Sequence, residues 1–129
     1  MKRTECSSRL VQWPCQIKLV PTNAPYLEGA DLLIAADCTA YAYASFHESF
    51  MKDRITLIGC PRLDATDYGE KLAEILHNNS IRSLLVLRME TPCCNELVSV
   101  LDKVLKRVAK EIPVQVVTLS TDGKIISRI

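Results

Sequence analysis

Cysteine is the residue type through which this chain could most readily do chemistry. The 129 residues include six cysteines, and four of them, Cys38, Cys60, Cys93 and Cys94, come after short apolar runs. Thiolates bind zinc and iron–sulfur clusters and attack disulfides, and a helix N-terminus favours the thiolate form. A free cysteine is also among the residues most often buried. A functional role therefore depends on how the fold places these side chains.

The elements that would place the cysteines can be predicted from the period of the apolar residues. Apolar or alternating runs predict strands at residues 16–20, 32–36, 55–58, 84–87 and 114–119. The turn residues Asp122 and Gly123 predict a further hairpin strand at 124–127. Between the strands the period becomes helical, over residues 43–50, 66–76 and 97–108.

This order of elements predicts a Rossmann-like α/β fold in three layers. We expect a mainly parallel sheet of five to six strands, helices on both faces and a C-terminal β-hairpin. Residues 1–12 are expected to form an N-terminal arm, and residues 13–129 a single α/β domain.

Three successive β-to-α turns of this layout carry the cysteines. Cys38 follows strand 32–36, Cys60 follows strand 55–58, and Cys93 and Cys94 follow strand 84–87 after a short loop. The carboxyl ends of parallel strands lie at one edge of the sheet, where ligands of open α/β sheets bind. We therefore predict a thiolate metal site made from Cys38, Cys60, Cys93 and Cys94.

Other polar side chains are expected near the same edge. Asp37 and Glu90 are candidate cofactor-binding residues, although Asp37 is explained equally well as a helix N-cap. For Asp64 the N-cap of the helix over residues 66–76 is the favoured interpretation. His47 is a further candidate metal ligand, but its place on an apolar helical stripe favours a buried core histidine. No catalytic residue can be assigned.

Composition argues against several classes of protein. The net charge is +1 and aromatic residues make up 5%, which does not suit nucleic-acid binding. The sequence contains no apolar run of the length that crosses a bilayer and no secretory signal, so we expect a cytoplasmic protein. It contains no G-x-G-x-x-G, no G-x-x-x-x-G-K-[ST] and no G-x-S-x-G motif.

Several stretches resemble one known family. The most specific are AADC at residues 35–38, GCPRLD at 59–64 and RMETPCC at 88–94. Together they are similar to a domain of iron–sulfur cluster-binding oxidoreductase-like proteins of anaerobic bacteria and archaea, and the resemblance covers the chain from about Leu10 onward. In that family the domain commonly follows a ferredoxin-type segment. This chain contains no C-x₂-C-x₂-C-x₃-C-P run, so it resembles the domain standing alone, and a ferredoxin-type 4Fe–4S cluster is not implied.

The motif positions that match the family coincide with the edge inferred above. They are Asp37, Cys38, His47, Cys60, Asp64, Glu90, Cys93 and Cys94. We expect a cysteine-based site that holds an iron–sulfur cluster or zinc and serves electron transfer with a ferredoxin-type protein. Two alternatives stay open: a metal-free thiol redox enzyme, and a non-catalytic accessory module of a redox complex. The sequence also leaves open whether the chain forms a homodimer.

Overall fold

β1 (Asp31–Ala36) is an inner strand of the sheet, and both of its neighbours follow it in the chain. The computed structural model describes residues 7–64, 68–92 and 95–129. The strand order is β2-β1-β3-β4-β5, and the first four strands run parallel. The remaining strands are β2 (Ile55–Gly59), β3 (Ser83–Met89), β4 (Val114–Leu119) and β5 (Ile125–Arg128). The predicted α/β fold is therefore confirmed, with five strands in the sheet.

The order of the strands reverses between β1 and β3. From β1 the chain crosses to β2 on one side and then returns to β3 on the other. Such a reversal leaves a crevice at the carboxyl ends of the two strands, since their connections leave in opposite directions. In this chain the turns after β1, β2 and β3 are neighbours at one edge of the sheet.

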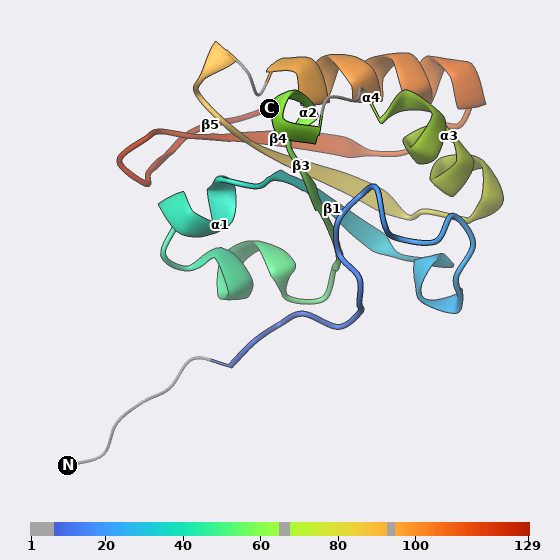
Figure 1. Ribbon diagram of the computed structural model, residues 1–129, viewed down its shortest axis with the longest axis horizontal. Coiled ribbons are helices and arrows are strands. Elements are labelled where there is room, and N and C mark those ends of the chain that lie inside the picture. Colours follow the sequence, from blue (N-terminus) through green and yellow to red (C-terminus); the bar gives the residue numbers. More distant parts are fainter. Residues whose placement is uncertain (1–6, 65–67, 93–94) are drawn as a thin grey trace.

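Helices cover both faces of the sheet, as Figure 1 shows. α3 (Gly69–Asn78) and α4 (Asn95–Val108) lie side by side on one face, and α1 (Thr39–Ala42) and the short π-helical segment η2 (His47–Met51) lie on the other. α2 (Pro61–Asp64) is a single turn directly after β2, and a 3₁₀ turn, η1 (Pro25–Leu27), precedes β1. In the described part of the chain, no helix has the length and apolar character needed to cross a bilayer.

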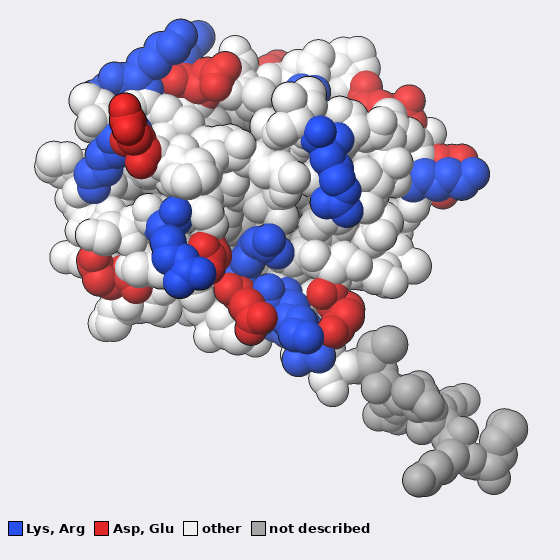
Figure 2. Space-filling model, turned by 180° about the vertical axis from the view of Figure 1, so that it is seen from behind, with Lys and Arg blue, Asp and Glu red and all other residues white. Residues whose placement is uncertain are grey.

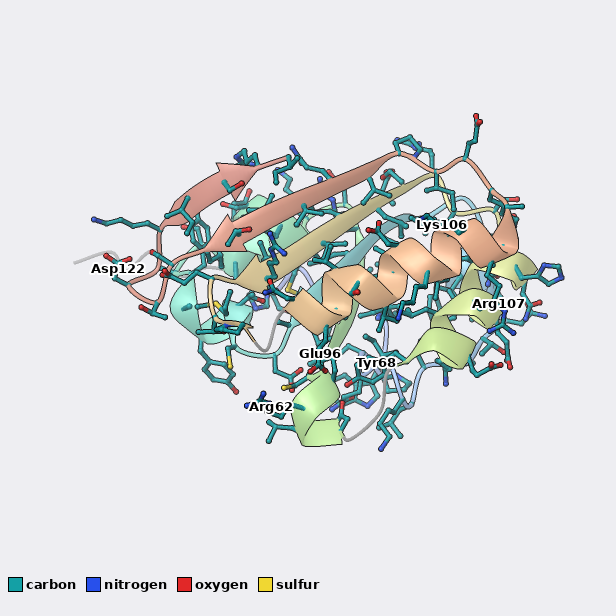
Figure 3. All side chains as sticks on the ribbon, turned by 90° about the horizontal axis from the view of Figure 1, so that it is seen from above. Arg62, Tyr68, Glu96, Lys106, Arg107 and Asp122 are labelled. Atoms are coloured by element: carbon teal, nitrogen blue, oxygen red, sulfur yellow. The ribbon has the colours of Figure 1, made fainter. Side chains whose placement is uncertain are left out.

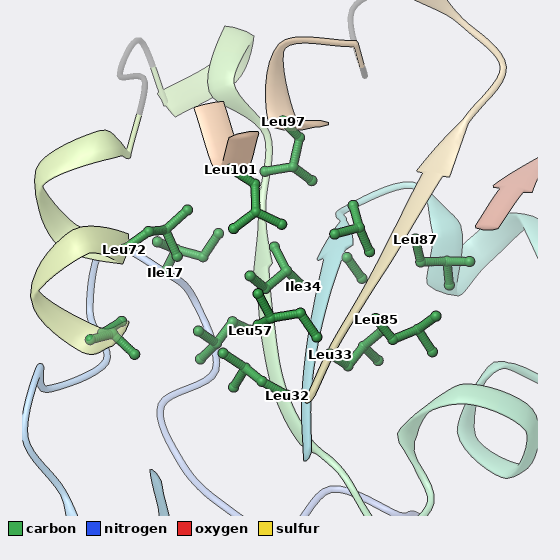
Figure 4. Packing of buried hydrophobic residues seen from close by; sticks show 14 of the residues in the cluster. Ile17, Leu32, Leu33, Ile34, Leu57, Leu72, Leu85, Leu87, Leu97 and Leu101 are labelled. Carbon is green, nitrogen blue, oxygen red and sulfur yellow. The ribbon is translucent and has the colours of Figure 1, made fainter. Parts of the chain in front are cut away.

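The core consists of two apolar layers separated by the sheet. Figure 4 shows Ile34 and Leu57 pointing toward Leu101 of α4, while Leu85 and Leu87 point to the other side. This alternation follows from the two-residue period of a strand. Because both faces are covered, the parallel strands are continuous apolar runs, and this is why they could be predicted from the sequence.

The β4–β5 hairpin is also confirmed, and it reaches back to α1. Gly123 at its turn has a φ of +85°, which L side chains rarely adopt. A Cβ on Gly123 would collide with the carbonyl oxygen of Ala42 at the end of α1. The hairpin turn therefore lies at the same edge of the sheet as the cysteine-bearing turns.

The predicted first strand at residues 16–20 is wrong. Only Gln16 forms a bridge, with Ile58 of β2, through hydrogen bonds from Ile17 N to Ile58 O and from Ile58 N to Cys15 O, each 2.9 Å long. The chain then turns, because the amides of Leu19 and Val20 both donate to Gln16 O. The alternating pattern reflects this turn, in which Ile17 and Val20 enter the core.

The side chain of Gln12 also pairs with the outer edge of β2. Gln12 is buried; its Nε2 donates to Thr56 O at 2.6 Å, and its Oε1 accepts from Thr56 N at 3.4 Å. Its amide thus takes the place of a peptide group of a neighbouring strand. The edge strand is thereby protected from pairing with other chains.

The helix predicted over residues 43–50 is wrong in its first half, because α1 ends before it and helical structure resumes only at η2. Tyr43 ends α1 with an extended backbone, φ −106° and ψ 115°. The aromatic stripe is real, because the ring of Phe50 lies 5.1 Å from that of Tyr43 and 6.3 Å from that of Phe46. These rings meet across a bend, and a helical period does not reveal the bend.

Candidate functional site

Cys38 and Cys60 follow neighbouring strands at the carboxyl edge of the sheet. Cys38 is the N-cap residue of α1 and is exposed, and Cys60 lies between Gly59 of β2 and Pro61 of α2 and is partly buried. Asp37 N donates to Gly59 O at 3.2 Å, so the two turns leave the sheet side by side. Both thiols are free. The predicted placement of these two cysteines is therefore what the structure has.

The third cysteine-bearing turn can be described only by its flanks. β3 ends at Met89, and α4 begins at Asn95. Cys93 and Cys94 lie outside the described residues. The loop that carries them starts beside β1, since β3 is the other neighbour of β1. Cys15, by contrast, is buried where the N-terminal segment meets β2.

His47 has a different environment from the one expected. It is exposed on η2, so the expected core histidine is wrong. Its Nδ1 accepts a hydrogen bond of 3.1 Å from Arg9 N in the N-terminal segment. Among residues 7–64, 68–92 and 95–129, no three His, Cys, Asp or Glu side chains lie close enough together to hold a metal ion.

Glu90 joins the end of β3 to the hairpin turn. Its amide donates to Leu119 O, and its Oε2 accepts from Thr121 N, each at 2.8 Å. Glu90 thus fixes the β4–β5 turn at the carboxyl edge, and Glu90 itself is exposed. In this position the carboxylate lies at the edge where the cysteine turns emerge.

Asp37, Asp64 and Tyr68 form a polar cluster next to the cysteine turns. The Tyr68 hydroxyl donates to Asp64 Oδ2. Burial raises the pKa of Asp37, and the nearby Asp64 carboxylate raises this pKa further. Two carboxylates in one partly buried place disfavour a double negative charge, so Asp37 keeps its proton to higher pH than an exposed aspartate does.

Tyr68 is the member of this cluster that the sequence did not reveal. Burial raises its pKa strongly; the hydrogen bond to Asp64 and the Asp64 charge act in the same direction. The backbone of Cys60 opposes this by hydrogen bonding. The hydroxyl of Tyr68 contacts the last residue of α2, and Figure 3 shows Tyr68 beside this turn.

The backbone of Tyr68 is strained. Its φ is 60°, in the left-handed region, although it is a bulky residue. Such a conformation costs on the order of 1–3 kcal/mol and persists only where the surroundings enforce it. The side chain is 3% exposed, and a Cβ on Gly59 would lie 2.6 Å from its Oη. Gly59 and the buried Tyr68 ring therefore require each other.

The predicted role of Asp64 as the N-cap of the second helix is wrong. α2 ends at Asp64 itself, and the N-cap residue of α3 is Tyr68. The aspartate accepts the Tyr68 hydroxyl instead. Tyr68 falls within the helical period predicted over residues 66–76, and no local signal distinguishes a core tyrosine from one that holds a turn.

The hollows of the surface do not single out the cysteine edge. One of about 590 Å³ lies between Ser7–Arg9 of the N-terminal segment and Ala44–Glu48 of the other sheet face. Figure 2 shows acidic and basic side chains interspersed on the face seen from behind. The carboxyl edge is distinguished by the chemistry of its side chains and not by a deep cleft.

Comparison with known proteins places the fold in a family. The chain is 33% identical over 100 residues to a protein of Archaeoglobus fulgidus described as uncharacterized, covering 78% of this chain and 71% of that protein. No solved structure gives a significant match. The model of the Rossmann-like domain family matches residues 24–129, which include all five strands. The chain belongs to the Rossmann-like domain family.

Proposed function

We propose that the carboxyl edge of the sheet binds a thiolate-ligated metal centre, an iron–sulfur cluster or zinc. Cys38, Cys60 and one of Cys93 and Cys94 would supply the ligands. The observation that carries the proposal is the position of β1 between β2 and β3, which makes the three strand ends that precede these cysteines neighbours. The resemblance of the motifs to iron–sulfur oxidoreductase-like proteins favours the cluster over zinc.

The environment of the two described thiols suits such a ligand role. Cys38 is exposed and Cys60 partly buried, so neither thiol is enclosed in the apolar core. Cysteine thiolates are the ligands that zinc and iron–sulfur centres use most. A metal centre at this edge would supply Lewis acidity as zinc or one-electron chemistry as a cluster.

Two exposed apolar side chains next to these cysteines support a role with a protein partner. Tyr41 in α1 is 93% exposed, and Leu63 in α2 is 79% exposed. Each lies in the helix that directly follows one of the cysteines. We propose a ferredoxin-type electron-transfer protein as the partner, for which such residues would provide apolar contact around the metal centre.

A metal-free thiol redox enzyme is the second candidate function. It is favoured by the exposure of Cys38 at the start of α1, because an accessible thiol can attack a disulfide directly. The two candidates differ in whether Cys60 and Cys38 act together on one ion.

Metal content of the protein purified without oxygen tests the proposal. We expect about one metal centre per chain and, for a cluster, visible absorption from sulfur-to-iron charge transfer. Cys38→Ser and Cys60→Ser should each lose the metal. Cys15→Ala is the matched control, since Cys15 is buried beside β2 and lies in none of the three turns, so its variant should keep the metal. A chain without metal, or one whose Cys38→Ser and Cys60→Ser variants keep it, contradicts the proposal.

A further inference from the structure

The turn that follows Cys60 is too short to hold its own shape. α2 comprises only Pro61–Asp64, closed by a hydrogen bond of 2.9 Å from Asp64 N to Cys60 O. A single helical turn is unstable in isolation, because the entropy of ordering its backbone exceeds the gain from its few hydrogen bonds. Contacts from outside α2 must therefore fix the direction of the Cys60 side chain.

Tyr68 makes such a contact at the end of the turn. Its hydroxyl donates to Asp64 Oδ2, and Asp64 N donates to Cys60 O at 2.9 Å. The hydroxyl is thus linked to the backbone of Cys60 through Asp64.

Tyr68 is itself held in place firmly enough to serve as a support. Its ring is buried, and its Cζ and Oη would lie 2.9 Å and 2.6 Å from a Cβ on Gly59. Gly59 is the last residue of β2 and directly precedes Cys60. The strained backbone of Tyr68 is consistent with a side chain that the core fixes first.

We infer that Tyr68 is a positioning residue that fixes the turn after Cys60 at the carboxyl edge, through its hydrogen bond to Asp64 and its packing against Gly59. The inference rests on the proposed function for its purpose, since a ligand thiol needs a fixed direction. The geometry itself can be tested in the absence of metal. Tyr68 acts through Cys60 and is not assigned contact with any ligand.

The test measures the alkylation rate of each cysteine in the reduced, chelator-treated full-length chain at one pH, with mass spectrometry of the peptides. The readout is the Cys60 rate divided by the Cys38 rate in the same sample. Tyr68→Phe should raise this ratio by about threefold or more, because the partly buried Cys60 becomes more accessible. Asp64→Ala should do the same.

Two conservative variants separate positioning from general loosening. Asp64→Asn keeps an acceptor oxygen for the Tyr68 hydroxyl and should leave the ratio at the wild-type value. Tyr26→Phe removes the hydroxyl of another tyrosine, one whose oxygen is buried away from α2, and should also leave it unchanged. If Tyr68→Phe does not fold, the alkylation ratios of Asp64→Ala and Asp64→Asn test the inference. An unchanged ratio in Asp64→Ala, or an equal rise in Tyr26→Phe, overturns the inference.

Titration with Co²⁺ distinguishes failure of this inference from failure of the proposed function. If the wild-type chain binds no Co²⁺ at its thiols, the proposed function fails while the alkylation ratio still decides the role of Tyr68. Where it binds, Tyr68→Phe and Asp64→Ala should weaken binding by about tenfold, in the range typical of residues that support metal ligands. Unchanged binding in both variants overturns the inference.

Discussion

Asp37 N donates a hydrogen bond of 3.2 Å to Gly59 O, so the chain segments that leave β1 and β2 start as a pair. One residue further along, each segment has a cysteine, Cys38 after Asp37 and Cys60 after Gly59. This backbone contact places two cysteine-bearing turns side by side although the cysteines are remote in sequence. The account of the site depends on this pairing of turns.

Because Gly59 lies against Tyr68, we expect a substitution of Gly59 to destabilise the protein. In Gly59→Ala the new Cβ would meet Tyr68 Oη at 2.6 Å and Cζ at 2.9 Å. We expect the free energy of unfolding to fall by about 1–3 kcal/mol, as overpacking of a core typically costs. Urea denaturation measures this change. Combined with Tyr68→Phe, the cost should be smaller, because one of the two colliding atoms is gone; a stability equal to wild type in Gly59→Ala would contradict the close approach.

A second effect on stability is expected from the hydrogen bonds that Lys110 makes at the end of α3. Its ammonium donates to Leu76 O, His77 O and Asn79 O, at 2.6, 3.3 and 3.2 Å. These carbonyls have no amide partners further along the helix, and a cation there also favours the helix dipole. Lys110→Met should lower the free energy of unfolding by about 1–2 kcal/mol.

Lys106→Met is the control for this effect. Lys106 is exposed in the last turn of α4, and its loss should change stability by no more than about 0.5 kcal/mol. Equal effects of the two substitutions, measured by urea denaturation, would show that Lys110 does not cap α3.

Acid should loosen the N-terminal segment through Glu48. Hydrogen bonds from Arg9 and Lys52 lower the pKa of Glu48 below its usual 4.5. A pKa that is lower in the folded state contributes stability that is present above the unfolded-state pKa and is lost as the pH falls through the folded-state value. Proteolysis between the N-terminal segment and the domain should therefore accelerate between about pH 5 and pH 3.

The variant Glu48→Gln isolates this carboxylate. It should be cleaved faster than wild type at neutral pH and should show less acceleration on acidification. Glu74→Gln, an exposed position on α3, should behave as wild type. An acceleration that is the same in wild type and Glu48→Gln would show that another group is responsible.

We expect the substitution Tyr26→Phe not to destabilise the protein. Its hydroxyl is buried without a hydrogen-bond partner in the described part of the chain, and burial raises its pKa. Removing an unsatisfied buried hydroxyl costs nothing in lost hydrogen bonds, so Tyr26→Phe should leave the free energy of unfolding unchanged or raise it by up to about 1 kcal/mol. A loss larger than about 1 kcal/mol would reveal a partner for this hydroxyl.

The inner strands β1 and β3 could be predicted because they are buried on both faces. β4 has the predicted bounds, and β3 extends the predicted run by Ser83, Arg88 and Met89. The strand predicted at 16–20 failed because a turn with two buried residues has the same alternation as a strand. The prediction of one continuous helix over residues 43–50 failed for a related reason, since aromatic rings can meet across a bend.

Only the part of the candidate site that follows from the strand topology could be predicted from the sequence. The placement of Cys38 and Cys60 follows from strand ends, which the sequence reveals. The role of Tyr68 does not, because it depends on a left-handed backbone and on contact with Gly59, and neither has a local signature. The same holds for His47, whose partner Arg9 lies far from it in sequence.

X-ray absorption at the metal edge of the anaerobically purified protein tests the central claim most directly. The account predicts a first shell dominated by sulfur, at about 2.3 Å for zinc or iron, with fewer sulfur neighbours in Cys60→Ser than in Cys15→Ala. A first shell of nitrogen and oxygen alone, or the same sulfur shell in both variants, would contradict it.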